Sequence, residues 1–99
     1  MKWLNKEFAD ALSEEIKKYI PSIVNRTHPN YGVVEDIIID EKKYLMRYDR
    51  NFGVHYCFEI YDGDEIIAKG DFPAVEVEEE YRVIRFYSNQ NATLFEYKL

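Results

Sequence analysis

The chain has 99 residues, a net charge of −6 and an aromatic content of 16%, with nine tyrosines and six phenylalanines. This length predicts a single domain over residues 1–99, and a hydrophobic fraction of 46% excludes a disordered tail. The acidic balance argues against direct binding of nucleic acid, because proteins that bind a phosphate backbone concentrate Lys and Arg.

The first predicted element is an amphipathic helix over residues 4–20, followed by a connector over residues 21–32. Its apolar residues recur at spacings of three and four, which is one face of a 3.6-residue period. They are Leu4, Phe8, Leu12, Ile16, Tyr19 and Ile20. Asn5 has the side chain of a helix N-cap. Pro21 predicts the end of the helix or the start of a short extra turn, because proline has no amide hydrogen to donate.

The pattern of residues 33–99 predicts a meander of five to six antiparallel strands. The expected strands lie near 33–39, 43–49, 54–61, 65–72, 75–87 and 93–98, and the glutamate run is a candidate break in the fifth. Alternation places the large apolar side chains of each strand on one face, and the helix is the only element that can cover it. The expected fold class is therefore α+β, with one N-terminal amphipathic helix packed on a curved antiparallel sheet.

Loop lengths predict the registers of three hairpins. A three-residue loop over residues 61–63 would place Gly63 at the left-handed position that such loops require. The predicted cross-strand pairs are Phe58 with Ile66, Tyr48 with Val54, and Phe86 with Thr93. A shift by one residue would turn a strand over, so the same reasoning assigns each side chain to a face.

The face of the sheet opposite the helix carries apolar side chains that the helix cannot cover. They are Leu45, Cys57, Tyr61, Ile67, Tyr81, Val83, Tyr87 and Leu94. A sheet face exposed to solvent normally carries polar residues. Either the sheet curls toward a barrel and buries some of these side chains, or this face contacts a second copy or another protein.

Two groups of residues have the composition of metal or catalytic sites. His55, Cys57 and Glu59 share one strand face, but a structural zinc site needs four ligands and the chain has one cysteine. A mid-strand position also lacks the positive surroundings that activate a thiol. Glu-x-Lys strings at residues 41–43 and 96–98 match a nuclease magnesium site in spacing, without room for its helical flanks. The sequence therefore predicts no catalytic residue, no metal ligand and no cofactor.

The acidic run contains Glu76, Glu78, Glu79 and Glu80. In an extended chain, Glu76, Glu78 and Glu80 would point the same way about 6.6 Å apart, a spacing similar to that of successive phosphates. Such a row could occupy the basic groove of a nucleic-acid-binding protein and steer it by long-range attraction. The alternative is a solvated edge strand whose charges prevent aggregation.

The cysteine content and the hydropathy pattern bear on the compartment. A single cysteine, Cys57, cannot form an internal disulfide, so a reducing compartment is expected. The longest aliphatic run, residues 37–39, is too short to span a bilayer, and the first residues lack a signal-peptide core. We expect a cytoplasmic protein with no membrane association.

In size, acidity and aromatic content the chain resembles small proteins of phages and mobile elements, among them host-takeover factors, anti-defence inhibitors and toxin-immunity proteins. The leading hypothesis is a non-enzymatic protein-binding module that inhibits or modulates a larger protein, with nucleic-acid mimicry as one mechanism. The expected contact residues are Tyr61, Tyr81, Tyr87, Glu76, Glu78 and Glu80. A small-ligand-binding domain and a homodimeric structural domain are the alternatives.

Overall fold

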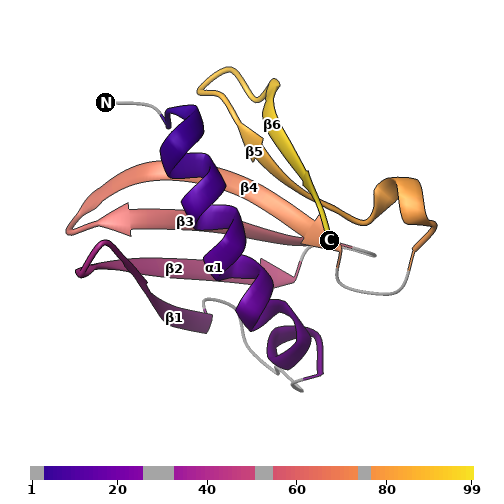
Figure 1. The fold of residues 1–99 in the computed structure, drawn as a ribbon, viewed down its shortest axis with the longest axis horizontal. Helices are drawn as coiled ribbons and strands as arrows, with labels where there is room; N and C mark the ends of the chain where they lie inside the picture. Colours follow the sequence, from indigo (N-terminus) through magenta and orange to yellow (C-terminus); the bar gives the residue numbers. More distant parts are fainter. Residues whose placement is uncertain (1–3, 26–32, 51–54, 74–76) are drawn as a thin grey trace.

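The computed structural model describes residues 4–25, 33–50, 55–73 and 77–99. In chain order the elements are α1 (Lys6–Asn25), β1 (Val33–Ile39), β2 (Lys42–Arg50), β3 (His55–Asp62), β4 (Glu65–Pro73), the 3-10 helix η1 (Glu79–Tyr81), β5 (Val83–Tyr87) and β6 (Thr93–Lys98). The six strands form one antiparallel sheet in the order β1 to β6, and α1 lies across one face of it (Figure 1). The predicted α+β class is confirmed.

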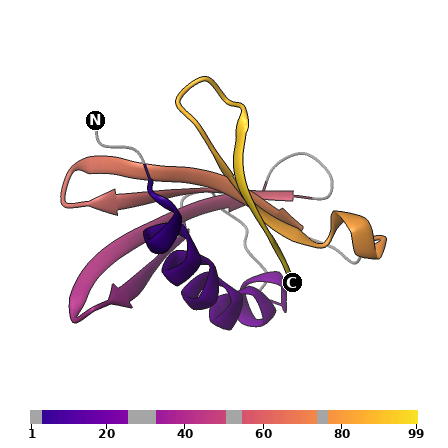
Figure 2. The same ribbon diagram turned by 45° about the horizontal axis from the view of Figure 1, so that its top comes forward.

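The sheet is curved, and α1 lies on its concave side (Figure 2). Within the described part of the sheet, neighbours in sequence are also neighbours in space, and β1 does not pair with β6. The sheet is therefore an open meander and not a barrel. No helix among the described residues combines the length and apolar character needed to cross a bilayer.

The start of α1 follows the sequence, whereas its end does not. Asn5 caps the first turn, because the Phe8 amide donates a hydrogen bond to Asn5 Oδ1 at 2.9 Å. The helix then continues through Pro21 to Asn25, so the predicted end at residue 20 is wrong and the alternative, an extra turn beyond Pro21, is the one that forms. Ile23 in the last turn is fully buried. Burying such a side chain contributes about 1.5–3 kcal/mol, comparable with the cost of a proline inside a helix.

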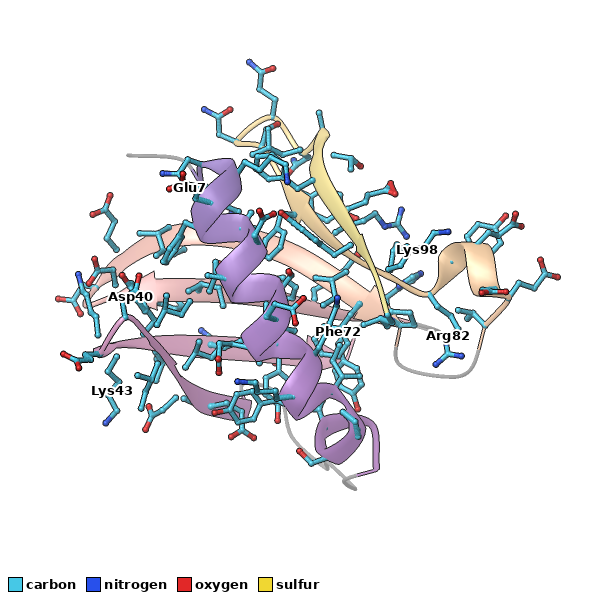
Figure 3. All side chains as sticks on the ribbon, in the orientation of Figure 1. Glu7, Asp40, Lys43, Phe72, Arg82 and Lys98 are labelled. Atoms are coloured by element: carbon cyan, nitrogen blue, oxygen red, sulfur yellow. The ribbon has the colours of Figure 1, made fainter. Side chains whose placement is uncertain are left out.

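The core lies between α1 and the inner, helix-covered face of the sheet. Its largest fully buried apolar side chains are Leu12, Ile16, Ile23, Ile37, Met46, Tyr48, Ile60, Phe72, Ile84 and Phe86. The Phe58 ring joins them, 6.1 Å from the Phe72 ring and 5.6 Å from the Phe86 ring between centroids. Figure 3 shows Phe72 on this covered side of the sheet, between α1 and the end of β6 in that view. The alternation predicted from the sequence therefore selects the correct face.

The predicted registers of all three hairpins are wrong, and each of the three predicted pairs is displaced by an even number of residues. The structure pairs Tyr48 with Phe58, Phe58 with Gly70, and Phe86 with Phe95. An even shift leaves side chains on their own face, which is why the assignment to faces survives the error except where a bulge interrupts the ladder.

The β3–β4 hairpin differs from the prediction in the length of its loop. Asp62 pairs with Glu65, so only Gly63 and Asp64 turn the chain; Gly63 has the predicted positive φ, at 62°. The ladder then shifts between residues 60 and 61. This shift makes Ile67 the unpaired extra residue, and Ile67 packs against the core instead of lying on the outer face as predicted.

Two tyrosine hydroxyls tie α1 to the two edges of the sheet. Tyr19 donates a hydrogen bond to the Asp36 carbonyl in β1 at 3.1 Å, and Tyr97 in β6 donates one to Asp10 Oδ1. Lys6 Nζ lies 3.0 Å from the same Asp10 oxygen. The Tyr97 bond and then the Lys6 ammonium lower the pKa of Asp10. Burial, followed by the bond to Asp10, raises the pKa of Tyr97.

Candidate protein-interaction surface

The outer face of the sheet, opposite α1, carries alternating charges over its centre. The registers place Arg47 opposite Glu59, and Glu59 opposite Lys69. Opposite charges facing each other across strands contribute about 0.2–1 kcal/mol per pair. Such a pattern is typical of a sheet face in water. The apolar side chains expected over the whole outer face are therefore concentrated in smaller regions.

One of these regions, here called the aliphatic corner, consists of Val34, Ile38 and Leu45. Their exposed fractions are 47%, 58% and 36%, respectively. Val34 and Ile38 flank Asp36 along β1, and Leu45 lies directly opposite Asp36 in β2. The three aliphatic side chains therefore surround one carboxylate, which forms an ion pair with Lys43 at 3.4 Å.

Tyr61 extends the aliphatic corner toward β3, because the register places it opposite Leu45. Its side chain is half-buried, and its hydroxyl lies 3.4 Å from Glu59 Oε1. Of the expected contact residues, Tyr61 is therefore the one that joins an exposed apolar surface. The ring and its aliphatic neighbour offer contact area with a polar tip, as interface tyrosines do.

Tyr87 has a different environment, because its hydroxyl is already engaged. It donates a hydrogen bond to Asp71 Oδ2 at 2.5 Å, from β5 to the neighbouring β4. Arg85 Nε lies 3.4 Å from Asp71 Oδ1, at ion-pair distance, yet both atoms are buried without a hydrogen bond among the described residues. Asp71 itself is 9% exposed. This network ties β4 to β5 across the outer face.

The network around Tyr87 favours a phenol that keeps its proton over one that transfers it. Burial, reinforced by the hydrogen bond to Asp71, raises the pKa of Tyr87 to about 12. The phenol therefore stays protonated near neutral pH and acts as a donor, not as a base. Cys57 lies opposite Asp71 in the ladder. The part of the chain that the structure describes contains no group of three or more His, Cys, Asp or Glu side chains placed to hold a metal ion.

The connection between β4 and β5 presents the second region, here called the acidic turn and formed by residues 78–81. Glu78, Glu79 and Glu80 are exposed, and Tyr81 is 53% exposed. The Tyr81 amide donates to the Glu78 carbonyl at 2.9 Å, which closes η1. Among the described residues, no side-chain hydrogen bond or ion pair involves these four side chains. The turn therefore projects three carboxylates and one aromatic ring into solvent.

The predicted fifth strand over residues 75–87 is shorter than expected, because β5 begins at Val83. Glu79 and Glu80 lie in η1, where the rise is about 2.0 Å per residue and not the 3.3 Å of a strand. The extended row that would resemble successive phosphates is thus not formed there. Glu76 lies outside the described residues.

The expected contact residues occupy separate places. Tyr61 and Tyr87 lie on the outer face, whereas Glu78, Glu80 and Tyr81 lie in the acidic turn. Figure 1 places the β3–β4 turn, next to Tyr61, and η1 at opposite ends of the molecule. Figure 3 shows the same separation, with Asp40 and Lys43 at one end and Arg82 at the other. A small partner could therefore contact one region without the other.

Sequence reasoning missed Val34 and Ile38 as surface residues. The signal was present, because residues 33–39 form a β-branched run in which alternate residues must face away from the helix. Asp71 and Arg85 were also missed. Their link to Tyr87 depends on the β4–β5 register, which local sequence does not reveal.

Comparison with protein families, with curated proteins and with solved structures finds no match for this chain.

Proposed function

We propose that this chain is a non-enzymatic protein-binding module that modulates a larger protein, and that the acidic turn docks on a basic surface of that partner. The observation that carries the proposal is Tyr81, 53% exposed beside three exposed carboxylates. Exposed tyrosines are favoured as interface anchors. Carboxylates around such a ring steer a basic partner and select against an acidic one.

A nucleic-acid-binding protein is the partner class that this chemistry favours, because such proteins carry concentrated basic surfaces. Occupying that surface would inhibit the partner, which is the role suggested by the resemblance to phage and mobile-element proteins. The turn geometry supports recognition by charge density and an aromatic anchor. It gives no support to a strand-like row of phosphate-spaced carboxylates.

The test compares two charge reversals that alter the net charge equally. Glu79→Lys with Glu80→Lys and Asp64→Lys with Glu65→Lys each change the charge from −6 to −2. The first pair reverses the acidic turn, and the second lies at the opposite end of the molecule (Figure 1). The tagged full chain and both variants are used to capture proteins from nuclease-treated bacterial lysate at low and moderate salt.

We expect the wild-type chain to capture one dominant protein. The amount captured should fall about tenfold with the acidic-turn variant and stay the same with the control variant. Moderate salt should weaken its capture by the wild-type chain as well. Equal capture by both variants, or capture unaffected by salt, would contradict the proposal.

A homodimeric structural domain is the second candidate, favoured by the exposed aliphatic corner. Contiguous exposed apolar side chains of this kind mark association surfaces. Light scattering on the same preparations separates the two functions. A dimer that both charge-reversal variants retain, with no captured protein, would favour this second candidate.

A further inference from the structure

The hydrogen-bonding pattern of β6 shows which of its backbone groups are unpaired. The Leu99 amide donates to the Arg82 carbonyl at 2.9 Å, and in the same register Ile84 pairs with Tyr97. Hydrogen-bonded pairs recur at every second residue of an antiparallel ladder. The amides and carbonyls of Tyr97 and Leu99 therefore point to β5, whereas those of Glu96 and Lys98 point away from it.

This edge of the sheet is open. Within the described part of the sheet β6 pairs with β5 alone, and no hydrogen bond from any described residue reaches the backbone of Glu96 or Lys98. Both side chains are exposed on the outer face. On the inner face Phe95 and Tyr97 are half-buried and pack against the core. The edge thus offers two unpaired backbone amides and two unpaired backbone carbonyls, those of Glu96 and Lys98. Apolar side chains line the inner face beside them.

The opposite edge of the sheet is partly closed. The β1–β2 turn has positive φ at Asp40 and Glu41, 50° and 66°, as in the type I′ hairpin whose flanking residues are hydrogen-bonded. Ile39 therefore bonds to β2, and the backbone of Asp36 points outward. Its carbonyl accepts the Tyr19 hydroxyl from α1. An added strand at β1 would have to displace that bond, and one at β6 would not.

We propose that the β6 edge accepts an extended segment of another protein as a seventh, antiparallel strand. Strand addition of this kind takes affinity from main-chain hydrogen bonds and specificity from alternate side chains. Charge complementarity places a basic residue opposite Glu96 and an acidic residue opposite Lys98. Apolar residues face Phe95 and Tyr97. This site goes beyond the acidic turn and does not depend on it.

A second copy of the chain would bring a second helix to this edge, which an isolated strand does not. Antiparallel pairing of β6 with itself keeps the inner faces of both sheets on the same side. On that side α1 lies against β6, because Asp10 bonds to Tyr97. The views in Figures 1 and 2 agree that the end of β6 runs beside the helix. Two copies paired through β6 would therefore bring two helices to the same side of one continuous sheet, next to the shared edge, whereas a single extended strand needs only the edge.

The test uses the full chain and two synthetic heptapeptides of identical composition. The first, Thr-Asp-Val-Lys-Val-Leu-Thr, places Asp opposite Lys98 and Lys opposite Glu96 when it pairs antiparallel. The second exchanges its Asp and Lys, which turns both attractive pairs into repulsive ones. We expect the exchanged peptide to bind about tenfold more weakly at low salt.

Amide hydrogen exchange locates the added strand. In the protein alone the amides of Glu96 and Lys98 should exchange fast, and those of Tyr97 and Leu99 slowly, because only the latter bond to β5. The first peptide should slow the exchange of Glu96 and Lys98. Protection of those amides that rises with protein concentration in the absence of peptide would identify a second copy as the occupant and overturn the proposal.

Two substitutions at one position separate the backbone from the side chain. Glu96→Pro removes the outward amide, and proline is tolerated on an edge strand where its nitrogen faces solvent. Glu96→Ala keeps the amide and removes the carboxylate. We expect Glu96→Pro to fold and to weaken binding of the first peptide by at least about tenfold, and Glu96→Ala by at most about threefold.

Three results would overturn the proposal. Neither peptide binds at millimolar concentration; Glu96→Pro binds as tightly as Glu96→Ala; or Glu96→Pro unfolds, which would mean that this amide is needed for the pairing with β5.

Discussion

The two faces of the same sheet differ in what holds their side chains in place. In β3, Phe58 is 2% exposed on the inner face, and its neighbour Cys57 is exposed on the outer face. Inner side chains are fixed by shape, because they fill the space under α1 at the density of a packed core. Outside the buried Tyr87–Asp71 network, outer side chains are held by charge pairs in water, which constrain them weakly. Stability therefore resides on the inner face, and the outer face and its margins are free for contacts.

The largest expected effect comes from truncating one ring of the inner face. Phe86→Ala should lower the free energy of unfolding by about 3–5 kcal/mol, because Phe86 is fully buried and its truncation leaves a cavity in the core. Leu94→Ala, at a residue 39% exposed in the adjoining strand, should change it by at most about 0.5 kcal/mol. Urea denaturation measures both. A comparable loss for Leu94→Ala would indicate that the outer side of β6 is covered in solution and contributes to stability as the inner face does.

A second test adds a methyl group to the inner face. A Cβ at Gly70 would lie 2.0 Å from the Arg85 carbonyl oxygen and 2.4 Å from Phe58 Cζ. The first of these is backbone and cannot rotate away, so Gly70→Ala should cost about 3 kcal/mol.

Gly63→Ala is the matched control for this addition. No atom lies within 4 Å of a Cβ at Gly63, and only its left-handed φ of 62° resists the change, for about 1 kcal/mol. Thermal unfolding distinguishes the two variants. If Gly63→Ala lowers the free energy of unfolding more than Gly70→Ala does, close packing at Gly70 is not what resists an added methyl group on the inner face.

The smallest effect belongs to the outer face. Tyr87→Phe removes one hydrogen bond to Asp71 and should cost about 1 kcal/mol at neutral pH. The pKa of Tyr87 is raised in the folded protein from 10.0 to about 12. The unfolded chain therefore loses this proton first as the pH rises, and the stabilisation, complete below pH 10.0, is lost between pH 10.0 and about 12.

Chemical denaturation at a series of alkaline pH values tests this linkage. Wild-type stability should fall more steeply than that of Tyr87→Phe over this range. Tyr81→Phe serves as the control, because Tyr81 makes no side-chain hydrogen bond among the described residues. Parallel curves for wild type and Tyr87→Phe would show that the bond to Asp71 does not hold the phenol proton.

The sequence was sufficient wherever the deciding interaction is local or periodic. Asn5 caps the helix because its side chain reaches an amide three residues away. Phe58 and Cys57 fall on opposite faces because the side-chain period of a strand is two. Strand alternation also identified Tyr81 as a surface residue, but it placed Tyr81 on the outer face of a strand and not in the 3-10 turn where it lies.

Only the tertiary structure decided which residues meet across the sheet. Hairpin registers depend on bulges and on the fit of whole strands under α1. The registers predicted from loop length were therefore wrong by two or four residues. The Tyr87–Asp71 bond follows from one of the registers that loop length does not give. Burial of Ile23 carried the helix past Pro21, against the local preference. The sequence alone determined the fold class and the faces of its strands, because periodicity is a local property. Strand pairing, sheet edges and surface clusters depend on contacts between distant residues, so only the tertiary structure decided them.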